Sequence, residues 1–306
     1  MRRYKHILVC VDQSDHDAPM LAYAGGRSRV AESTEVHFLH VLDDTVRTDD
    51  DASPPPELTR EMLQTLVAEH FKGHGREQLI YEVIRGSSLI EALRYAHEKD
   101  IDLIILGRHY GRRGEAGDTA LLARRITRKS TCSALVLPEE YRFQADALVV
   151  PVRNSECSAG ALEVACGIAA VTGATVTALN IYRVGAGYAR TGKTLDEHQA
   201  LLEAAAEREC ARLLERTDTH EVAVECRCVP DLHSDPVPII LDLLGDGLGK
   251  AVVIGARGRT GAAGVLLGTI TEQLIRRSPS PVVAVKKKGE CLGLLRALLV
   301  TMGEEY

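Results

Sequence analysis

The sequence predicts an α/β protein made of two tandem domains, each built on a five-stranded parallel sheet. Short Val/Ile-rich runs alternate with longer stretches that carry apolar residues at helical spacing, and this order is typical of parallel strands joined by helices. The second half of the chain repeats the order of the first. The 306 residues suffice for about two domains, and aromatic residues make up only 4%, so Val, Ile, Leu and Ala must form the cores.

The repeat is visible as pairs of similar segments. "HILVCVDQS" corresponds to "ALVVPVRNS", and each is an apolar run followed by a helix-start signal. The paired segments are 6–14 with 147–155, 35–43 with 175–183, 102–110 with 251–258, and 125–137 with 273–285, the last at a shift of 148 residues. A period near half the chain indicates duplicated domains rather than a solenoid.

In the first half, short Val/Ile-rich runs predict strands near 5–12, 35–42, 77–84, 101–107 and 132–138. Helices are expected between them near 16–31, 57–73, 88–99 and 118–130. The first domain is predicted to span residues 1–140, and "PEEYRFQAD" (138–146) is the expected linker.

The second half predicts strands near 146–153, 174–182, 221–229, 249–256 and 281–286. Helices are expected near 156–172, 195–216, 234–246 and 262–277, and "EHQALLEAAAERECARLLERT" shows the helical spacing clearly. The second domain is predicted to span 146–286. Residues 287–306 form a C-terminal tail, which we expect to pack on a domain or on a partner.

Composition excludes several classes of protein. A net charge of −6 and a pI near 6.0 argue against general nucleic-acid binding. No apolar run has the length of a transmembrane helix, and the N-terminus lacks the features of a signal peptide. The eight cysteines are scattered, so we expect reduced, buried thiols in a cytoplasmic protein.

A glycine-rich stretch, "GARGRTGAAGVLLGT" (255–269), joins a predicted strand to a predicted helix. Gly255 and Gly258 would let the chain turn and expose main-chain N–H groups, while Gly268 and Thr269 would lie near the helix start, where phosphate binds well. Arg257 would offset phosphate charge. The alternative is that the glycines serve tight strand-to-helix packing without any ligand.

The spacing Gly255-x₂-Gly258-x₉-Gly268-Thr269 resembles the G-x₂-G-x₉-G-[S/T] signature of the universal stress protein family, and the resemblance extends over both halves. It implies a Rossmann-like fold of the adenine nucleotide alpha hydrolase type, with the two halves packed as a pseudo-dimer. It also implies ATP binding, with or without Mg²⁺, a regulatory role in the stress response, and a homodimer of tandem chains with a further, unidentified protein partner.

The resemblance also implies which residues bind the nucleotide. The phosphate end falls on the signature residues and the isoleucines beside them: Ile254, Gly255, Arg257, Gly258, Gly268, Thr269 and Ile270. The adenosine end falls on Val152, Arg153 and Ile181. The sequence departs from the family here, because the usual acidic residue is present in the first half as Asp12 but is replaced by Arg153 in the second.

The first half lacks the signature. At the shift of 148 residues, Gly258, Gly268 and Thr269 become Tyr110, Ala120 and Leu121. Leucine offers no hydrogen bond to a phosphate, and tyrosine would crowd the main chain. We therefore expect one nucleotide site in each chain, in the second domain.

Rival motifs are weaker. "GYARTGKT" (187–194) fits the P-loop pattern, but several residues separate it from its strand and no carboxylate-ended partner strand follows. "ECRCVPDLH" lacks zinc-site spacing, and Cys226 and Cys228 are expected to be buried thiols. No nucleophile elbow is present, so neither catalytic residues nor metal ligands are assigned and ATP hydrolysis would be weak at most. The alternatives are a slow ATPase and a scaffold whose nucleotide site is vestigial.

Overall fold

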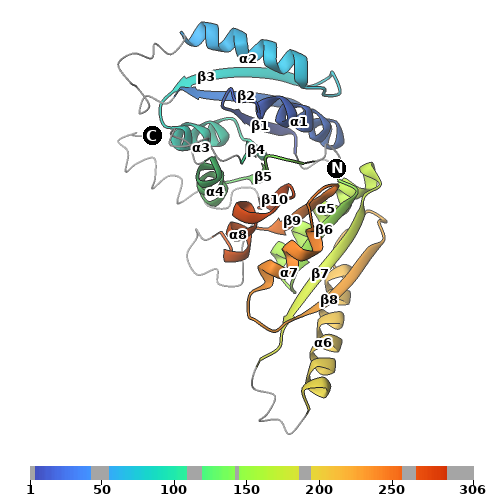
Figure 1. Ribbon diagram of the computed structural model, residues 1–306. Helices are drawn as coiled ribbons and strands as arrows, with labels where there is room; N and C mark the ends of the chain where they lie inside the picture. The colour runs from blue at the N-terminus through green and yellow to red at the C-terminus, as the bar shows by residue number, and fades with distance from the viewer. Residues whose placement is uncertain are drawn as a thin grey trace. The chain divides into compact units, whose positions relative to one another are not determined.

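The computed structural model describes residues 4–42, 55–108, 119–141, 145–185, 194–256 and 267–287. The chain divides into two compact units. Unit 1 contains Met1–Gln144, and unit 2 contains Ala145–Thr260 together with Gly268–Val285. Each unit is an α/β fold around a parallel sheet, which confirms the predicted fold class (Figure 1).

Unit 1 carries five parallel strands in the order β3-β2-β1-β4-β5. Helices α1 and α2 pack together, as do α3 and α4 (Figure 1). The elements are β1 His6–Val11, α1 Asp17–Ala31, β2 Glu35–Leu42, α2 Pro56–His70, β3 Gln78–Arg85, α3 Ser88–Glu98, β4 Leu103–Gly107, α4 Thr119–Lys129 and β5 Ser133–Leu137.

Unit 2 repeats this arrangement with the order β10-β9-β6-β7-β8, again with all strands parallel. Its elements are β6 Ala147–Val152, α5 Glu156–Thr172, β7 Thr175–Arg183, α6 Leu195–Glu215, β8 Val224–Asp231, α7 Pro236–Leu244, β9 Lys250–Gly255, α8 Thr269–Arg277 and β10 Val282–Val285.

Two element starts in unit 2 differ from the prediction. Strand β8 begins at Val224 rather than near 221, because His220 and Glu221 have φ of 51° and 62° and so form a turn that a strand cannot include. Helix α8 begins at Thr269 rather than near 262: Leu267 and Gly268 are not helical, and residues 261–266 lie outside the described part of the chain.

The cores are mainly aliphatic, as the composition predicts. Side chains of β1 such as Ile7 and Leu8 are fully buried. Unit 1 adds one aromatic cluster in which Phe38 lies 5.2 Å from Phe71 and 5.6 Å from Tyr81, measured between ring centroids. These contacts attach the chain after α2 and the edge strand β3 to strand β2.

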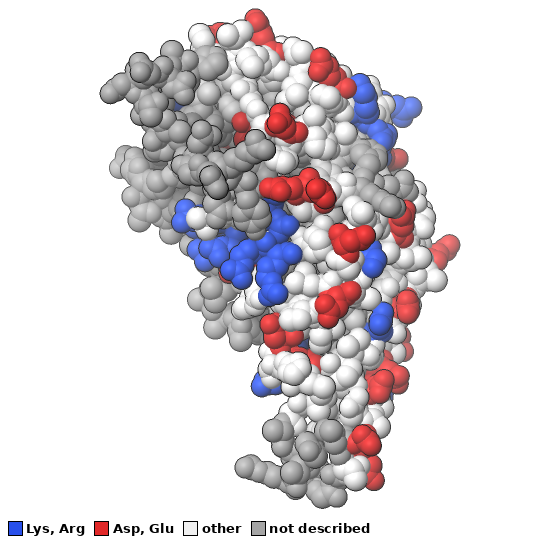
Figure 2. Space-filling view, in the orientation of Figure 1, with Lys and Arg blue, Asp and Glu red and all other residues white. Residues whose placement is uncertain are grey.

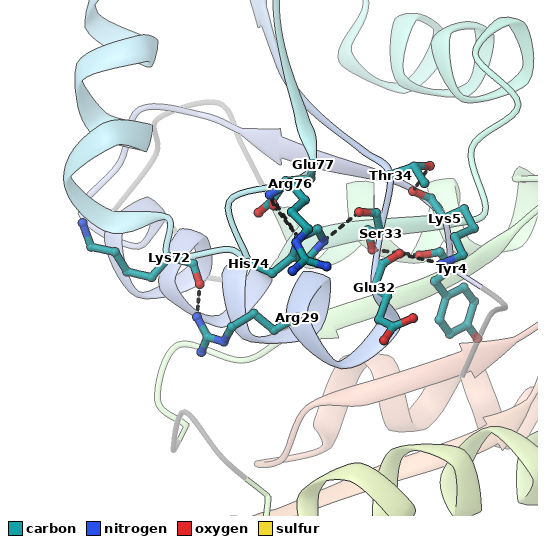
Figure 3. Close-up of polar contacts among 10 residues, drawn as sticks. All are labelled: Tyr4, Lys5, Arg29, Glu32, Ser33, Thr34, Lys72, His74, Arg76 and Glu77. Carbon is teal, nitrogen blue, oxygen red and sulfur yellow. Dashed lines mark hydrogen bonds and ion pairs between the residues drawn. The ribbon is translucent and has the colours of Figure 1, made fainter.

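A polar cluster joins the turn after α1 to the connection between α2 and β3 (Figure 3). Nε2 of His74 donates to the Ser33 carbonyl at 2.8 Å, and the Arg76 amide donates to Nδ1 of His74 at 3.2 Å. The Arg29 guanidinium donates to the Lys72 carbonyl from the end of α1. These bonds give main-chain groups of the two connections partners within the fold.

A disulfide joins Cys210 of α6 to Cys226 of β8, so the expectation that all cysteines are reduced is wrong for this pair. The expectation that Cys226 is buried is also wrong: Cys210 is 1% exposed, whereas Cys226 lies exposed on an edge strand. Helix α6 packs against β8, and this contact brings together two cysteines 16 positions apart. Cys10, Cys132 and Cys166 remain free thiols, as expected.

The surface carries both signs of charge. Figure 2 shows acidic side chains spread over one face of the molecule, with much of the basic charge gathered in one patch. Within the described residues, no helix is long and apolar enough to cross a membrane.

The disulfide should stabilise unit 2. Closing a loop of this length is worth about 3 kcal/mol, so Cys226→Ser should lower the free energy of unfolding by roughly 2–3 kcal/mol in urea titrations. The exposed position of Cys226 means that little packing is lost with the bond. Cys228→Ser, two positions along the same strand, is the matched control and should change stability little. Equal stability of the wild type with and without dithiothreitol would contradict the prediction.

Candidate functional site

Both sheets reverse their strand order at a central strand. In unit 1, β1 pairs with β2 on one side and β4 on the other; in unit 2, β6 pairs with β7 and β9. In sheets of this kind, ligands bind beyond the carboxyl ends of the strands at the point of reversal. Candidate site residues are therefore those that follow β1 and β4 in unit 1 and β6 and β9 in unit 2.

In unit 2, helix α8 starts directly beside the end of β9. The Gly268 amide donates to the Ala256 carbonyl at 2.9 Å, and the Thr271 hydroxyl donates to the Gly255 carbonyl at 3.3 Å. These two bonds hold the first turn of the helix against the strand end. Gly268 is the N-cap residue and Thr269 is the first helical residue, in agreement with the sequence-based expectation that they lie at the helix start.

The first turn of α8 presents amide donors. The Glu272 amide donates to the Gly268 carbonyl at 3.0 Å, which is the first hydrogen bond of the helix. The amides of Thr269, Ile270 and Thr271 come before it, so they have no carbonyl of their own helix as an acceptor. Together with the helix dipole, such groups favour an anion. The Thr269 side chain is exposed and adds a hydroxyl to this surface.

Gly255 serves close packing. A Cβ at this position would lie 2.7 Å from the Cys157 carbonyl oxygen and 2.8 Å from the Cys157 Cβ, at the start of α5. Gly255 is also absent from the described glycines with a positive φ, so it does not use the left-handed region of the backbone. The packing interpretation, left open by the sequence, therefore holds for this glycine.

The remaining predicted residues surround the same strand ends. Val152 ends β6 and lies beside Asn180 of β7, which places Ile181 one residue further along. The side chains of Val152 and Ile181 are buried, and so is that of Ile254 in β9; Ile270 is half-buried on α8. Arg257 and Gly258 lie outside the described residues.

Arg153 follows β6, and its side chain is exposed. Its main-chain amide donates to the Ser158 hydroxyl at 3.0 Å. This bond orients the strand end and does not involve the arginine side chain. The chain therefore keeps its main-chain geometry here although an arginine stands at the position of Asp12 in unit 1.

In unit 1 the side chain that accepts the amides after the first strand is that of an aspartic acid. Asp17 occupies the repeat position of Ser158, and it accepts the Gln13 amide at 2.6 Å and the Asp12 amide at 3.4 Å. Asp17 is 1% exposed, and burial, with a smaller contribution from the nearby Asp12 charge, raises its pKa to about 7. Sequence reasoning missed this group, although aligning Asp17 with Ser158 in the repeat would have revealed it.

Unit 1 also contains a cavity of about 140 Å³ at the ends of β1, β2 and β4. Asp12, Asp17 and His40 line it together with apolar side chains of the strands and of α1, α3 and α4. Nδ1 of His40 lies 2.8 Å from the Val11 carbonyl and so donates to it; in the neutral ring this tautomer has Nε2 as the acceptor. No pattern in the sequence indicated this cavity.

Comparison with known proteins shows which family the sequence matches. The sequence model of the universal stress protein family matches residues 3–138 and 145–286. A universal stress protein from Archaeoglobus fulgidus is 18% identical, with a TM-score of 0.60, over 93% of this chain and 99% of its own. None of the curated proteins compared with the sequence matches it.

Two structures from Pseudomonas aeruginosa are also similar to the whole chain. One is a protein of unknown function from strain PAO1, 16% identical with a TM-score of 0.66, covering 98% of each chain. The other, described as a putative universal stress protein from strain UCBPP-PA14, is 15% identical with a TM-score of 0.62 over 98% of this chain and 99% of its own. At these identities the likeness establishes the fold.

The packing role of Gly255 predicts a clear loss of stability. Gly255→Ala should destabilise unit 2 by about 1–3 kcal/mol, because the new methyl group meets main-chain atoms of α5 that cannot move aside. Gly160→Ala is the matched control: its Cβ meets nothing within 4 Å, and alanine suits the interior of α5 better. Urea unfolding of both variants is the measurement, and equal effects would refute the packing role.

The raised pKa of Asp17 predicts a dependence of stability on pH. Its ordinary value is 3.8, so the fold favours the protonated form, and the stabilisation present near pH 4 is lost as the pH rises to about 7. Asp17→Asn cannot ionise and so lacks this loss. The difference in melting temperature between Asp17→Asn and the wild type should therefore rise by roughly 5 °C, in favour of the variant, between pH 4 and about pH 7. The exposed Asp15→Asn is the control and should show no such trend.

Proposed function

Because the chain belongs to the universal stress protein family, we propose that it binds ATP in unit 2 and that nucleotide occupancy regulates its association with a protein partner. The observation that carries the proposal is the first turn of α8, whose amides stand at the carboxyl end of β9 at the point where the strand order reverses. The role is one of binding rather than turnover.

The phosphate end of the proposed site is main-chain based. The amides of Thr269, Ile270 and Thr271 and the Thr269 hydroxyl would donate to the terminal phosphates, with support from the helix dipole. Arg257 and Gly258 of the signature would complete this end. Mg²⁺ would come with the triphosphate, because oxygens of the phosphates are ligands that it prefers.

The adenosine end of the proposed site lies at β6 and β7. The buried side chains of Val152 and Ile181 give this end an apolar floor. Arg153 stands where an acidic residue would accept hydrogen bonds from the ribose. An exposed guanidinium cannot accept such bonds but can pair with phosphate, so we propose that this site holds the nucleotide more by its phosphates than by its ribose.

Unit 1 is not proposed as an ATP site. Its helix α4 has Ala120, which is buried, and Leu121 where α8 has Gly268 and Thr269. Neither side chain can donate to a phosphate, and Asp12 brings negative charge to the same strand ends. A homodimer of tandem chains remains a prediction, as do the domain limits 1–140 and 146–286.

A charge introduced at the start of α8 tests the proposal. Thr269→Glu should reduce ATP affinity at least tenfold in isothermal titration calorimetry, because the carboxylate would occupy the anion position and repel phosphate. The fold should be retained, since an exposed acidic residue suits the first turn of a helix. Thr269→Ser keeps the hydroxyl and should bind like the wild type.

The corresponding change in unit 1 assigns the site. Thr119 is the first residue of α4, so Thr119→Glu places the same charge at the start of the other helix. It should leave ATP binding unchanged. If Thr119→Glu abolished binding and Thr269→Glu did not, the nucleotide would belong to unit 1. Absence of binding to the wild type at millimolar ATP would favour the vestigial scaffold.

A further inference from the structure

The cavity of unit 1 is not used by the proposed ATP site, and its size restricts what could enter it. It measures about 140 Å³. An engineered protein cavity of about 150 Å³ holds one benzene molecule, so this cavity accommodates an apolar group of about one ring. A nucleoside triphosphate would have to leave most of its atoms outside.

The walls of the cavity suit such a group. Met20, Leu39, Leu106, Leu122 and Ile126 line it from four different elements of unit 1. Leu39 and Ile126 are almost fully buried, so the deeper wall belongs to the packed core. An apolar ring placed there would be removed from water, which favours binding.

The cavity is lined by Asp12, Asp17 and His40 and by further polar side chains that include His16, Ser88 and Thr119. The exposed Asp12 carboxylate stands beside the end of β1, and the buried His40 on the neighbouring strand β2 offers Nε2 as an acceptor because Nδ1 is held by the Val11 carbonyl. Asp17 lines the same cavity and accepts the Asp12 amide at 3.4 Å. A positive charge placed beside the Asp12 carboxylate would be attracted, whereas a phosphate would be repelled.

We propose that the cavity of unit 1 is a binding site for a small organic amine, with its ammonium group on Asp12 and an apolar body of about one ring against the core. His40 would accept a second hydrogen bond from the ligand through Nε2. This ligand class differs from the nucleotide proposed for unit 2, and the site uses other residues.

Benzylamine is a suitable probe, and benzyl alcohol and phenyl phosphate are its neutral and anionic counterparts. With the full chain, we expect calorimetry to show benzylamine binding more tightly than either. Asp12→Asn should lower the affinity for benzylamine at least tenfold, as loss of a charge-assisted hydrogen bond implies. It should change the affinity for benzyl alcohol less than twofold. Asp15→Asn, exposed in the same turn, should change neither.

Several results would overturn the inference: no benzylamine binding at millimolar concentration, tighter binding of phenyl phosphate, or the same effect from Asp12→Asn and Asp15→Asn. Displacement of benzylamine by ATP would also overturn it, because the two ligands are assigned to different units. The inference is independent of the proposed function: Thr269→Glu should retain benzylamine binding whether or not ATP binds to the wild type.

Discussion

The hydrogen bond from the Gly268 amide to the Ala256 carbonyl fixes where helix α8 begins, and the proposed nucleotide site depends on that position. A helix that began a turn earlier or later would direct its first amides away from the strand ends. The second bond, from the Thr271 hydroxyl to the Gly255 carbonyl, holds the same turn from the side of the helix. Gly255 in turn lets α5 approach β9 closely, so one residue contributes both to packing and to the geometry of the proposed nucleotide site.

The two units use the same architecture with different chemistry at their strand ends. At one repeat position unit 1 has Asp17 and unit 2 has Ser158, and each accepts an amide at the end of its first strand. At another repeat position, unit 1 has the acidic Asp12 and unit 2 has the basic Arg153. Negative charge and leucines therefore surround the cavity of unit 1, while the strand ends of unit 2 have an arginine and a helix start. Duplication preserved the fold and left the ligand chemistry free to diverge.

Much of the fold could be predicted from the sequence, because strands buried on both faces are read as continuous Val/Ile-rich runs and the repeat shows the same order twice. The start of β8 could not, since the left-handed residues His220 and Glu221 are neither glycine nor asparagine. The Cys210–Cys226 disulfide was missed because it depends on how α6 packs against β8. The close approach of α5 to Gly255 likewise exists only in three dimensions.

The most direct test of the account is nuclear magnetic resonance of the ¹⁵N-labelled full chain during titration with ATP. We predict that the amide resonances of Thr269, Ile270 and Thr271 shift the most and saturate together, while those of Asp12 and Gln13 in unit 1 stay in place. Unchanged resonances in the first turn of α8, or saturating shifts confined to unit 1, would contradict it.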